Sequence, residues 1–184
     1  MEKYELLAKL INYPGSEFLE EAKMARAHLD KAYPATTELM ENYISAIKEI
    51  SLDKIQESYT TTFDLQQMCS LDVGYVMFGE DYKRGEFLVN VQRLCKEHQV
   101  DVKSELPDHL PNMLVLLPRL PEEERKEVAQ KILIPALEKM VSTLNQGDAN
   151  KNFFVLPLQV IEKILNTDFE IKKRRKALYG GPRC

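Results

Sequence analysis

The sequence has few glycines, no tryptophan and no long apolar run. Seven glycines in 184 residues are too few for a β-sandwich or barrel with many tight turns. No apolar run approaches the roughly 20 residues that a membrane span needs. The N-terminal segment carries acidic residues where a signal peptide would begin with basic ones. We therefore expect a cytoplasmic protein with a helical fold.

Cysteine is also scarce. Cys69, Cys95 and Cys184 are odd in number, and no two of them have the spacing of a zinc site. The three histidines form no metal-ligand pair either. We expect free thiols, two of them in or near the core, and neither a metal nor a cofactor.

The sequence motifs that are typical of the common catalytic sites are absent. The chain has no glycine-rich phosphate loop, no HExxH zinc motif and no GxSxG nucleophile turn. An enzyme could still assemble its site from distant residues, but no motif predicts one. We expect no catalytic residues and a protein that is not an enzyme.

Negative and positive charges are separated along the chain. Residues 167–184 contain six Lys or Arg and two acidic residues, whereas residues 1–166 contain 19 basic and 27 acidic residues. This predicts a domain over residues 1–166 with a net charge of −8, followed by a basic tail. A solvated, disordered end is the simpler interpretation of the tail. The other is an arm that docks on a partner or covers a groove of its own chain.

Apolar residues recur at helical spacing along most of the chain. The first stripes lie within residues 7–11, 18–29 and 40–47, and Pro14 and Pro34 follow the first two. No segment alternates like a strand. The pattern predicts an all-α, single-domain bundle of about seven helices.

Residue types that favour helix ends predict the middle of the chain. Asp64, with Gln67 three residues later, predicts a helix start, and Gly79 predicts that helix's end. Another helix is expected from about Asp81 to Glu97.

Prolines mark the C-terminal helices. Pro121, followed by three glutamates, predicts the start of a long helix, which Pro135 should kink. A last helix is expected over residues 153–165, with Pro157 in its first turn.

The segment ELPDHLPNML, residues 105–114, has two interpretations. In one, Asp108 caps a helix by accepting a hydrogen bond from the backbone N–H of Leu110, and His109 merely follows it. In the other, Pro107 and Pro111 stiffen a surface that presents His109 and Leu110 to a partner, so that docking loses little entropy. Both can hold together.

Two blocks of this sequence resemble a known family. They are YTTTFDLQQMCSLDVGYVMFGEDYKRG, residues 59–85, and ELPDHLPNML. The pattern and the spacing between the blocks resemble the nitrate reductase delta-subunit-like chaperones, within the wider family of molybdoenzyme assembly chaperones, or redox enzyme maturation proteins. The family often has an aromatic residue at position 72, and an acid and an aromatic at 115 and 116. Asp72, Val115 and Leu116 depart from this, which leaves the client enzyme open.

The resemblance implies a TorD-like helical fold and a non-catalytic role. Such proteins bind the apo catalytic subunit of a molybdenum oxidoreductase through its N-terminal leader and hold it in the cytoplasm until molybdenum cofactor is inserted. Proteins that deliver the cofactor are further partners, while nucleic acid and stable membrane insertion are not expected. The resemblance places the partner-binding residues at Tyr59, Phe63, Asp64, Leu71, Tyr75, Arg84, Leu106, Pro107, Asp108, His109, Leu110 and Pro111.

We expect Asp64, Asp108 and neighbouring acidic residues to attract leader cations, and Tyr59, Tyr75 and Leu110 to line an apolar floor. A core position is the competing interpretation for Phe63, Leu71 and Tyr75, because apolar residues at helical spacing usually face the core.

Two other functions remain as alternatives at this stage. A guanine-nucleotide-binding protein or weak hydrolase is suggested by properties reported for some relatives, but no phosphate loop supports it. A nucleic-acid binder is suggested by the basic tail and disfavoured by the acidic domain.

Overall fold

The structure of the protein, a computed structural model, describes residues 2–65, 69–102, 104–146 and 152–169. Within these ranges the chain forms ten α-helical segments and no strand. The helices are α1 (Glu2–Lys9), α2 (Phe18–Leu29), α3 (Thr37–Ile47), α4 (Leu52–Tyr59), α5 (Val73–Phe78), α6 (Tyr82–Glu97), α7 (Leu110–Leu116), α8 (Glu122–Val128), α9 (Ile134–Gln146) and α10 (Val155–Asp168). The predicted all-α, single-domain fold is confirmed.

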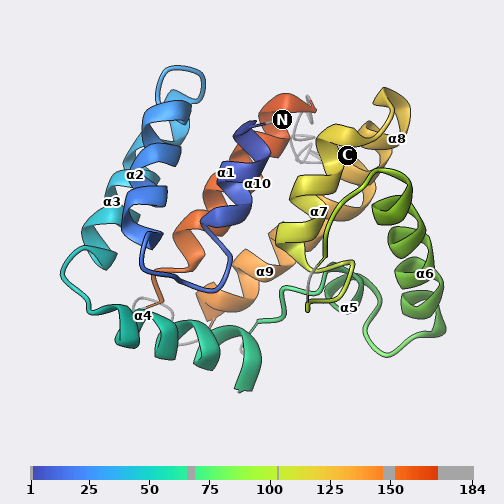
Figure 1. The fold of residues 1–184 in the computed structure, drawn as a ribbon, viewed down its shortest axis with the longest axis horizontal. Coiled ribbons are helices and arrows are strands. Elements are labelled where there is room, and N and C mark those ends of the chain that lie inside the picture. The colour runs from blue at the N-terminus through green and yellow to red at the C-terminus, as the bar shows by residue number, and fades with distance from the viewer. Residues whose placement is uncertain (1, 66–68, 103, 147–151, 170–184) are drawn as a thin grey trace, which may run out of the picture.

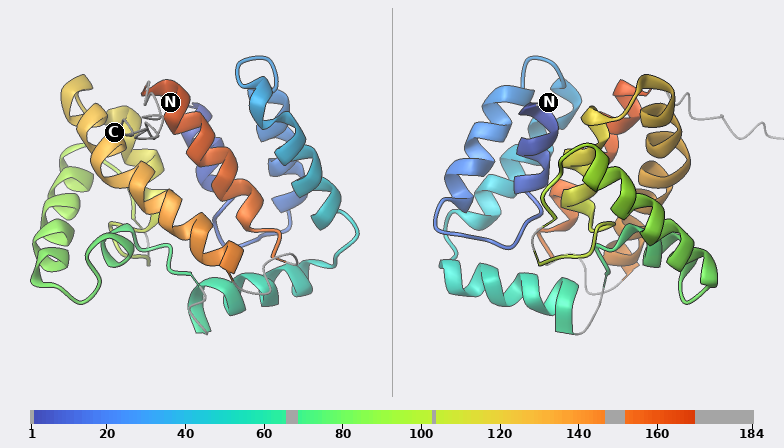
Figure 2. Two further views of the ribbon diagram at one scale, coloured as in Figure 1. Left: turned by 180° about the vertical axis from the view of Figure 1, so that it is seen from behind. Right: turned by 45° about the vertical axis from the view of Figure 1, so that its right-hand side comes forward.

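The helices pack around a central group. In Figure 1, α1 and α10 lie in the middle, α2 and α3 form one flank, α6 forms the other, and α4 crosses below. The views from behind and from the side in Figure 2 agree, and contacts join α9 to α10, α1 to α7 and α2 to α3. The apolar faces predicted from the helical spacing of the sequence pack against one another in this group. Among the described ranges, every helix is too short or too polar to span a bilayer.

Several helix ends follow the sequence prediction. Asp81 precedes α6, and its carboxylate accepts a hydrogen bond from the backbone N–H of Lys83 at 2.9 Å. Gly79 ends α5 with a φ of 61°, a conformation that suits glycine. Pro157 lies in the first turn of α10, where its missing N–H is tolerated.

The long helix after Pro121 contains a π-helical turn. The segment η4 (Ala129–Leu133) joins α8 to α9, just before Pro135. Pro135 has no N–H to donate to the preceding turn, and π turns are one way in which helices accommodate such a break. One continuous helix therefore counts as two segments, which raises the number above about seven.

The predicted helix start at Asp64 is wrong. Helix α4, which the sequence analysis did not predict, continues as a π-helical turn η2 (Thr60–Leu65), so Asp64 lies at the end of a helix. The hydroxyl of Thr62 donates to the carbonyl of Ser58 at 2.7 Å, which ties the threonine run to the preceding turn. Gln67, the other half of the expected capping pair, lies outside the described residues.

Candidate functional site

The two blocks of sequence that carry the family resemblance meet in space. An isolated antiparallel bridge pairs Asp72 with His109. On either side of it, the N–H of Val73 donates to the carbonyl of Asp108 at 3.0 Å, and the N–H of Leu110 donates to the carbonyl of Leu71 at 2.9 Å. The start of α5 and the start of α7 are thereby fixed against each other.

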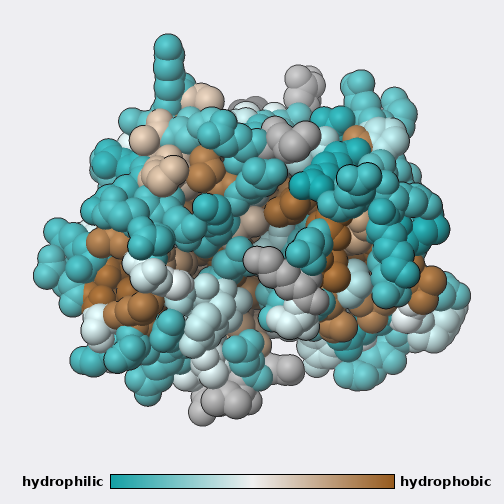
Figure 3. Space-filling view, in the orientation of Figure 1, coloured by the Kyte–Doolittle hydropathy of each residue, from teal (hydrophilic) through white to brown (hydrophobic). Residues whose placement is uncertain are grey.

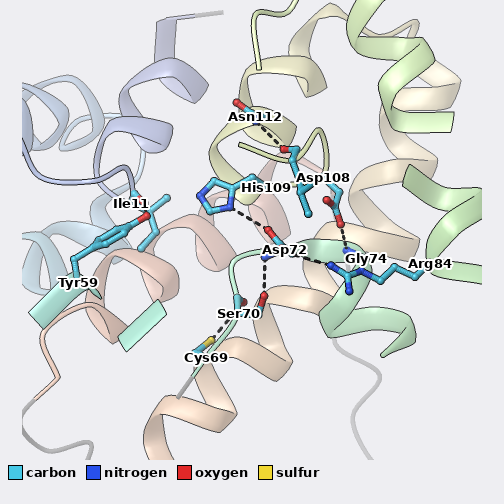
Figure 4. Close-up of polar contacts among 11 residues, drawn as sticks. Ile11, Tyr59, Cys69, Ser70, Asp72, Gly74, Arg84, Asp108, His109 and Asn112 are labelled. Carbon is cyan, nitrogen blue, oxygen red and sulfur yellow. Dashed lines mark hydrogen bonds and ion pairs between the residues drawn. The ribbon is translucent and has the colours of Figure 1, made fainter. Parts of the chain in front are cut away.

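Asp108 caps a helix, but not the predicted one. Its Oδ2 accepts a hydrogen bond at 2.8 Å from the N–H of Gly74, the second residue of α5 (Figure 4). The expected donor, the N–H of Leu110, is bonded to Leu71 instead, and the side chain of His109 at the cap position of α7 makes no capping hydrogen bond to that helix. The carboxylate therefore satisfies a free N–H of a helix distant in sequence. The predicted cap on α7 is wrong because the local N–H already has a backbone partner.

The junction between Asp108 and Gly74 is closely packed and buried. Asp108 has 0% of its surface exposed, and its Oδ1 has no hydrogen-bond partner among the described residues. A Cβ on Gly74 would lie 2.7 Å from Oδ2 of Asp108 and 2.9 Å from Cδ1 of Phe87, so glycine fits this position. Burial raises the pKa of Asp108, and the N–H of Gly74 and the charge of Arg84 only partly oppose this. The buried carboxylate of Asp108 thus holds two segments of the fold together.

Asp72 connects His109 to Arg84 at the surface of this junction. Its Oδ1 lies 3.2 Å from Nδ1 of His109, and its Oδ2 lies 3.5 Å from a terminal nitrogen of Arg84 (Figure 4). The guanidinium of Arg84 also lies over the ring of Tyr75, 5.1 Å from its centre. The imidazole of His109 is thus held on one side by a carboxylate.

The other side of His109 faces a groove of about 490 Å³, which we call the acidic groove. It is formed by the end of α1 and the residues that follow it, the end of α4 with η2, and residues within 101–102 and 104–115. Its lining residues are Ala8, Asn12, Tyr13, Tyr59, Asp64, Asp101, Val102, Ser104, Glu105, His109, Pro111, Asn112 and Val115.

The acidic groove combines an apolar floor with carboxylates. Tyr59 packs edge to face on Tyr13 with ring centres 5.4 Å apart, and Val115 and Pro111 add aliphatic surface. The described lining holds three carboxylates and no lysine or arginine. Elsewhere on the face shown in Figure 3, hydrophobic residues appear as separate patches among hydrophilic ones.

Two carboxylates of the groove, those of Asp64 and Glu105, repel each other. Partial burial and the charge of Glu105 raise the pKa of Asp64, while His109 lowers it. A cation bound between these carboxylates would offset their mutual repulsion. The groove therefore suits a ligand that is apolar in part and positively charged.

The structure separates the predicted site residues into groups. Tyr59, Asp64, His109 and Pro111 line the acidic groove. Tyr59 and Pro111 are largely buried even so, and four other residues are buried without lining the groove: Phe63, Leu71, Asp108 and Leu110. The carbonyl of Leu106, a 43% exposed residue, accepts a hydrogen bond from the side chain of Asn112 in the groove wall, and Pro107 follows half-buried.

Tyr75 and Arg84 lie apart from the groove. Tyr75 lines a second, open cavity of about 740 Å³ between α5 and α9, whose lining includes Pro135 and Met140. Arg84 reaches the first site only through its contact with Asp72. Tyr75 and Arg84 therefore do not share the groove with Tyr59, Asp64, His109 and Pro111.

Sequence reasoning missed several groove residues. Tyr13 is 56% exposed beside Tyr59, and its position just before Pro14, at the end of an apolar stripe, was the available signal. Glu105 is the first residue of the ELPDHLP segment, so its negative charge was a signal that the sequence already contained. Asp101 and Val102 lie in a linker without any periodic pattern, and only the fold could place them.

The described residues contain no group of three or more metal-ligating side chains that could hold a metal ion. Cys69 and Cys95 are free and buried, and Cys184 lies outside the described residues. The carboxylates of the groove can attract positively charged groups.

Comparison with known proteins supports the resemblance. Residues 26–147 match the family model of the nitrate reductase delta subunit. Two proteins of Escherichia coli, from strains K12 and O157:H7, are each 29% identical to the chain over 119 residues, or 64% of this chain and 49% of the relative. Each is named nitrate reductase molybdenum cofactor assembly chaperone NarJ. The chain thus spans about half the length of these curated relatives.

Proposed function

Because the chain belongs to the nitrate reductase delta subunit family, we propose that it is an assembly chaperone for a molybdenum oxidoreductase of the nitrate reductase type. It binds the apo catalytic subunit in the cytoplasm and assists insertion of the molybdenum cofactor. The names of the two Escherichia coli relatives support this role. In this proposal the chain acts by binding and carries no catalytic group.

The client's N-terminal leader binds in the acidic groove. One observation carries this assignment: the carboxylates of Asp64 and Glu105 line the same groove as Tyr59 and Val115. A basic, amphipathic leader can place apolar side chains on such a floor and its cations at the rim. Binding a cation also removes the repulsion that raises the pKa of Asp64.

Two of the predicted residues, Asp108 and Leu110, support the groove without touching the leader. Asp108 and Leu110 are fully buried, so neither can contact a ligand in this conformation. Asp108 fixes α5 against the start of α7, which positions His109. Asp72 holds the ring of His109 from behind. In this proposal, Asp108 and Leu110 contribute through the fold, and His109 contributes through contact.

A guanine nucleotide fits this groove poorly. Its phosphates would face three carboxylates without a described lysine or arginine in the lining. The structure gives no observation that favours this alternative over a basic peptide.

The test is calorimetric titration with the N-terminal peptide of the molybdoenzyme catalytic subunit encoded nearest the gene. The parent chain is compared with an Asp64→Asn, Glu105→Gln variant. Neutralising two carboxylates should weaken binding about tenfold at low salt, because each pair with a leader cation contributes up to about 1 kcal/mol. Added salt should reduce the difference.

A matched control has the same change in charge away from the groove. Glu49 and Glu86 are exposed and do not line the acidic groove. The Glu49→Gln, Glu86→Gln variant should bind the leader like the parent. Equal weakening in both variants would show that net charge alone matters and would refute the groove assignment. Failure of the folded parent to bind any leader would refute leader recognition.

A further inference from the structure

We propose that the basic segment of this chain's own residues 170–184 occupies the acidic groove and is displaced when a client leader binds. The position of the segment stands independently of the client. Its displacement rests on the proposed function. The groove is then a regulated site, for which a client leader competes with the basic segment of the same chain.

Charge complementarity is the first argument. Residues 170–184 contain six basic residues and one glutamate, a net charge of +5, and the rest of the chain has 19 basic and 28 acidic residues, a net charge of −9. Five of the basic residues are consecutive, from Lys172 to Lys176. The groove offers the opposite charge through Asp64 and Glu105.

The sequence after the basic run matches the floor of the groove. Ala177, Leu178 and Tyr179 follow Lys176 directly. The groove places apolar and aromatic surface, including Tyr59 and Val115, beside its carboxylates. A segment that is first basic and then apolar can satisfy both parts of this lining.

The start of the segment lies within reach. Asp168, the last residue of α10, accepts hydrogen bonds from Lys3 at 2.5 Å and from Tyr4 at 2.6 Å, beside the start of α1. The far end of α1 leads into the groove at Ala8 and Asn12. From Tyr4 to Asn12 the distance is about 12 Å at the helical rise.

The basic run covers that distance. The carbonyl of Phe169 accepts a hydrogen bond from Gln130 at 2.9 Å, which fixes the point of departure. Extended chain advances about 3.3 Å per residue, so Lys172 can reach about 10 Å and Lys176 about 23 Å from Phe169. The length from Tyr4 to Asn12 at the helical rise, about 12 Å, falls between these two limits.

A nearer cavity suits the segment less well. A cavity of about 350 Å³ beside Phe169 is lined by Glu122 and Asp168 but also by Arg125 and Lys126. These two cations oppose a run of lysine and arginine, whereas the described lining of the acidic groove contains neither residue type. Because a short tether holds the segment at an effective concentration of about a millimolar, an intrinsic dissociation constant below about a millimolar is enough to fill most of the grooves.

A spin label in the segment tests its position in the full chain. The label is attached to an Ala177→Cys, Cys184→Ser variant. Cys69 and Cys95 are buried, and burial raises the pKa of both thiols, so they react slowly. We expect the amide signals of Ser104, His109 and Asn112 to broaden at low salt and to recover at high salt.

Two further variants check the charge argument. Broadening should disappear in the Asp64→Asn, Glu105→Gln variant and persist in the Glu49→Gln, Glu86→Gln control. Broadening centred on Glu122 to Glu124 would overturn the proposal in favour of the start of α8. Broadening of unlabelled chains mixed with labelled ones would overturn it in favour of contact between two copies.

Displacement is measured separately with the leader peptide. Adding the peptide should restore the groove signals, and replacing all five residues from Lys172 to Lys176 by glutamine should tighten its binding by about threefold to tenfold. A leader that binds while broadening persists would overturn displacement. A groove that is broadened by the segment but binds no leader would leave the segment's position standing and refute the proposed function.

Discussion

The Asp108 carboxylate accepts its hydrogen bond from the backbone N–H of Gly74, 34 residues away in the chain. Helix α5 is therefore capped by the segment that begins α7, and each element fixes the other. The bridge between Asp72 and His109 lies beside this bond. Through these contacts a buried junction positions the imidazole that lines the acidic groove.

The stability of Asp108→Asn should depend on pH differently from that of the parent. Burial raises the pKa of Asp108 in the fold, so the parent loses stability as pH rises from the ordinary pKa near 4 through the raised value. Asparagine does not ionise. Relative to the parent, the free energy of unfolding of the variant should therefore rise over this window in urea titrations. A constant difference from pH 4 to 7 would contradict the raised pKa.

Asp108→Ala tests the hydrogen bond itself. Removing the acceptor leaves the N–H of Gly74 buried without a partner, which should lower the free energy of unfolding by about 1–3 kcal/mol. Urea titration near pH 4 is the cleanest measurement, because the parent then carries the least charge at this position. Unchanged stability there would mean that the bond to Gly74 contributes nothing net.

Gly74→Ala and Gly85→Ala form a matched pair. At Gly74 the new methyl group would clash with Asp108 and Phe87, and such overpacking lowers the free energy of unfolding by about 1–3 kcal/mol. Gly85 lies within α6 with open space around it, so alanine there should stabilise by about 0.5–1 kcal/mol. Thermal unfolding measures both, and changes of the same sign would contradict the close approach at Gly74.

Tyr13→Ala and Phe63→Ala separate contact from packing. Tyr13 is 56% exposed at the groove, so its loss should weaken leader binding with a stability change below about 1 kcal/mol. Phe63 is 5% exposed between Tyr59 and Phe154, and its truncation should destabilise by about 3–5 kcal/mol. Calorimetric titration and urea unfolding are run on both variants. If Tyr13→Ala binds the leader unchanged, Tyr13 is not a contact residue.

The thiol of Cys69 should resist alkylation until the protein unfolds. Burial raises its pKa to about 12, so at pH 8 its thiolate fraction falls roughly a thousandfold below that of an ordinary cysteine. Iodoacetamide labelling followed by peptide mass spectrometry measures this in the native protein and in urea. Rapid modification of Cys69 in the native state would contradict its burial.

The sequence predicted helices best where a short local signal decides the structure. Asp81 and Gly79 mark helix ends because capping and left-handed backbone depend on one residue and its neighbours. The prediction failed at Asp64, where the bonds of the preceding turn extend a helix through η2. An acidic residue fits either place, so its identity alone could not decide.

The sequence by itself determined the helical class, the separation of charge and the family, because each resides in periodicity, composition or a linear motif. It also predicted Tyr59, Asp64 and His109 as binding residues, and these three line the acidic groove. Only the tertiary structure decided that Asp108 lies in the interior, that Tyr75 lines a different cavity and that Tyr13 joins the groove. The physical reason is that a carboxylate or an aromatic ring takes its role from whichever distant backbone or surface the folded chain brings to it.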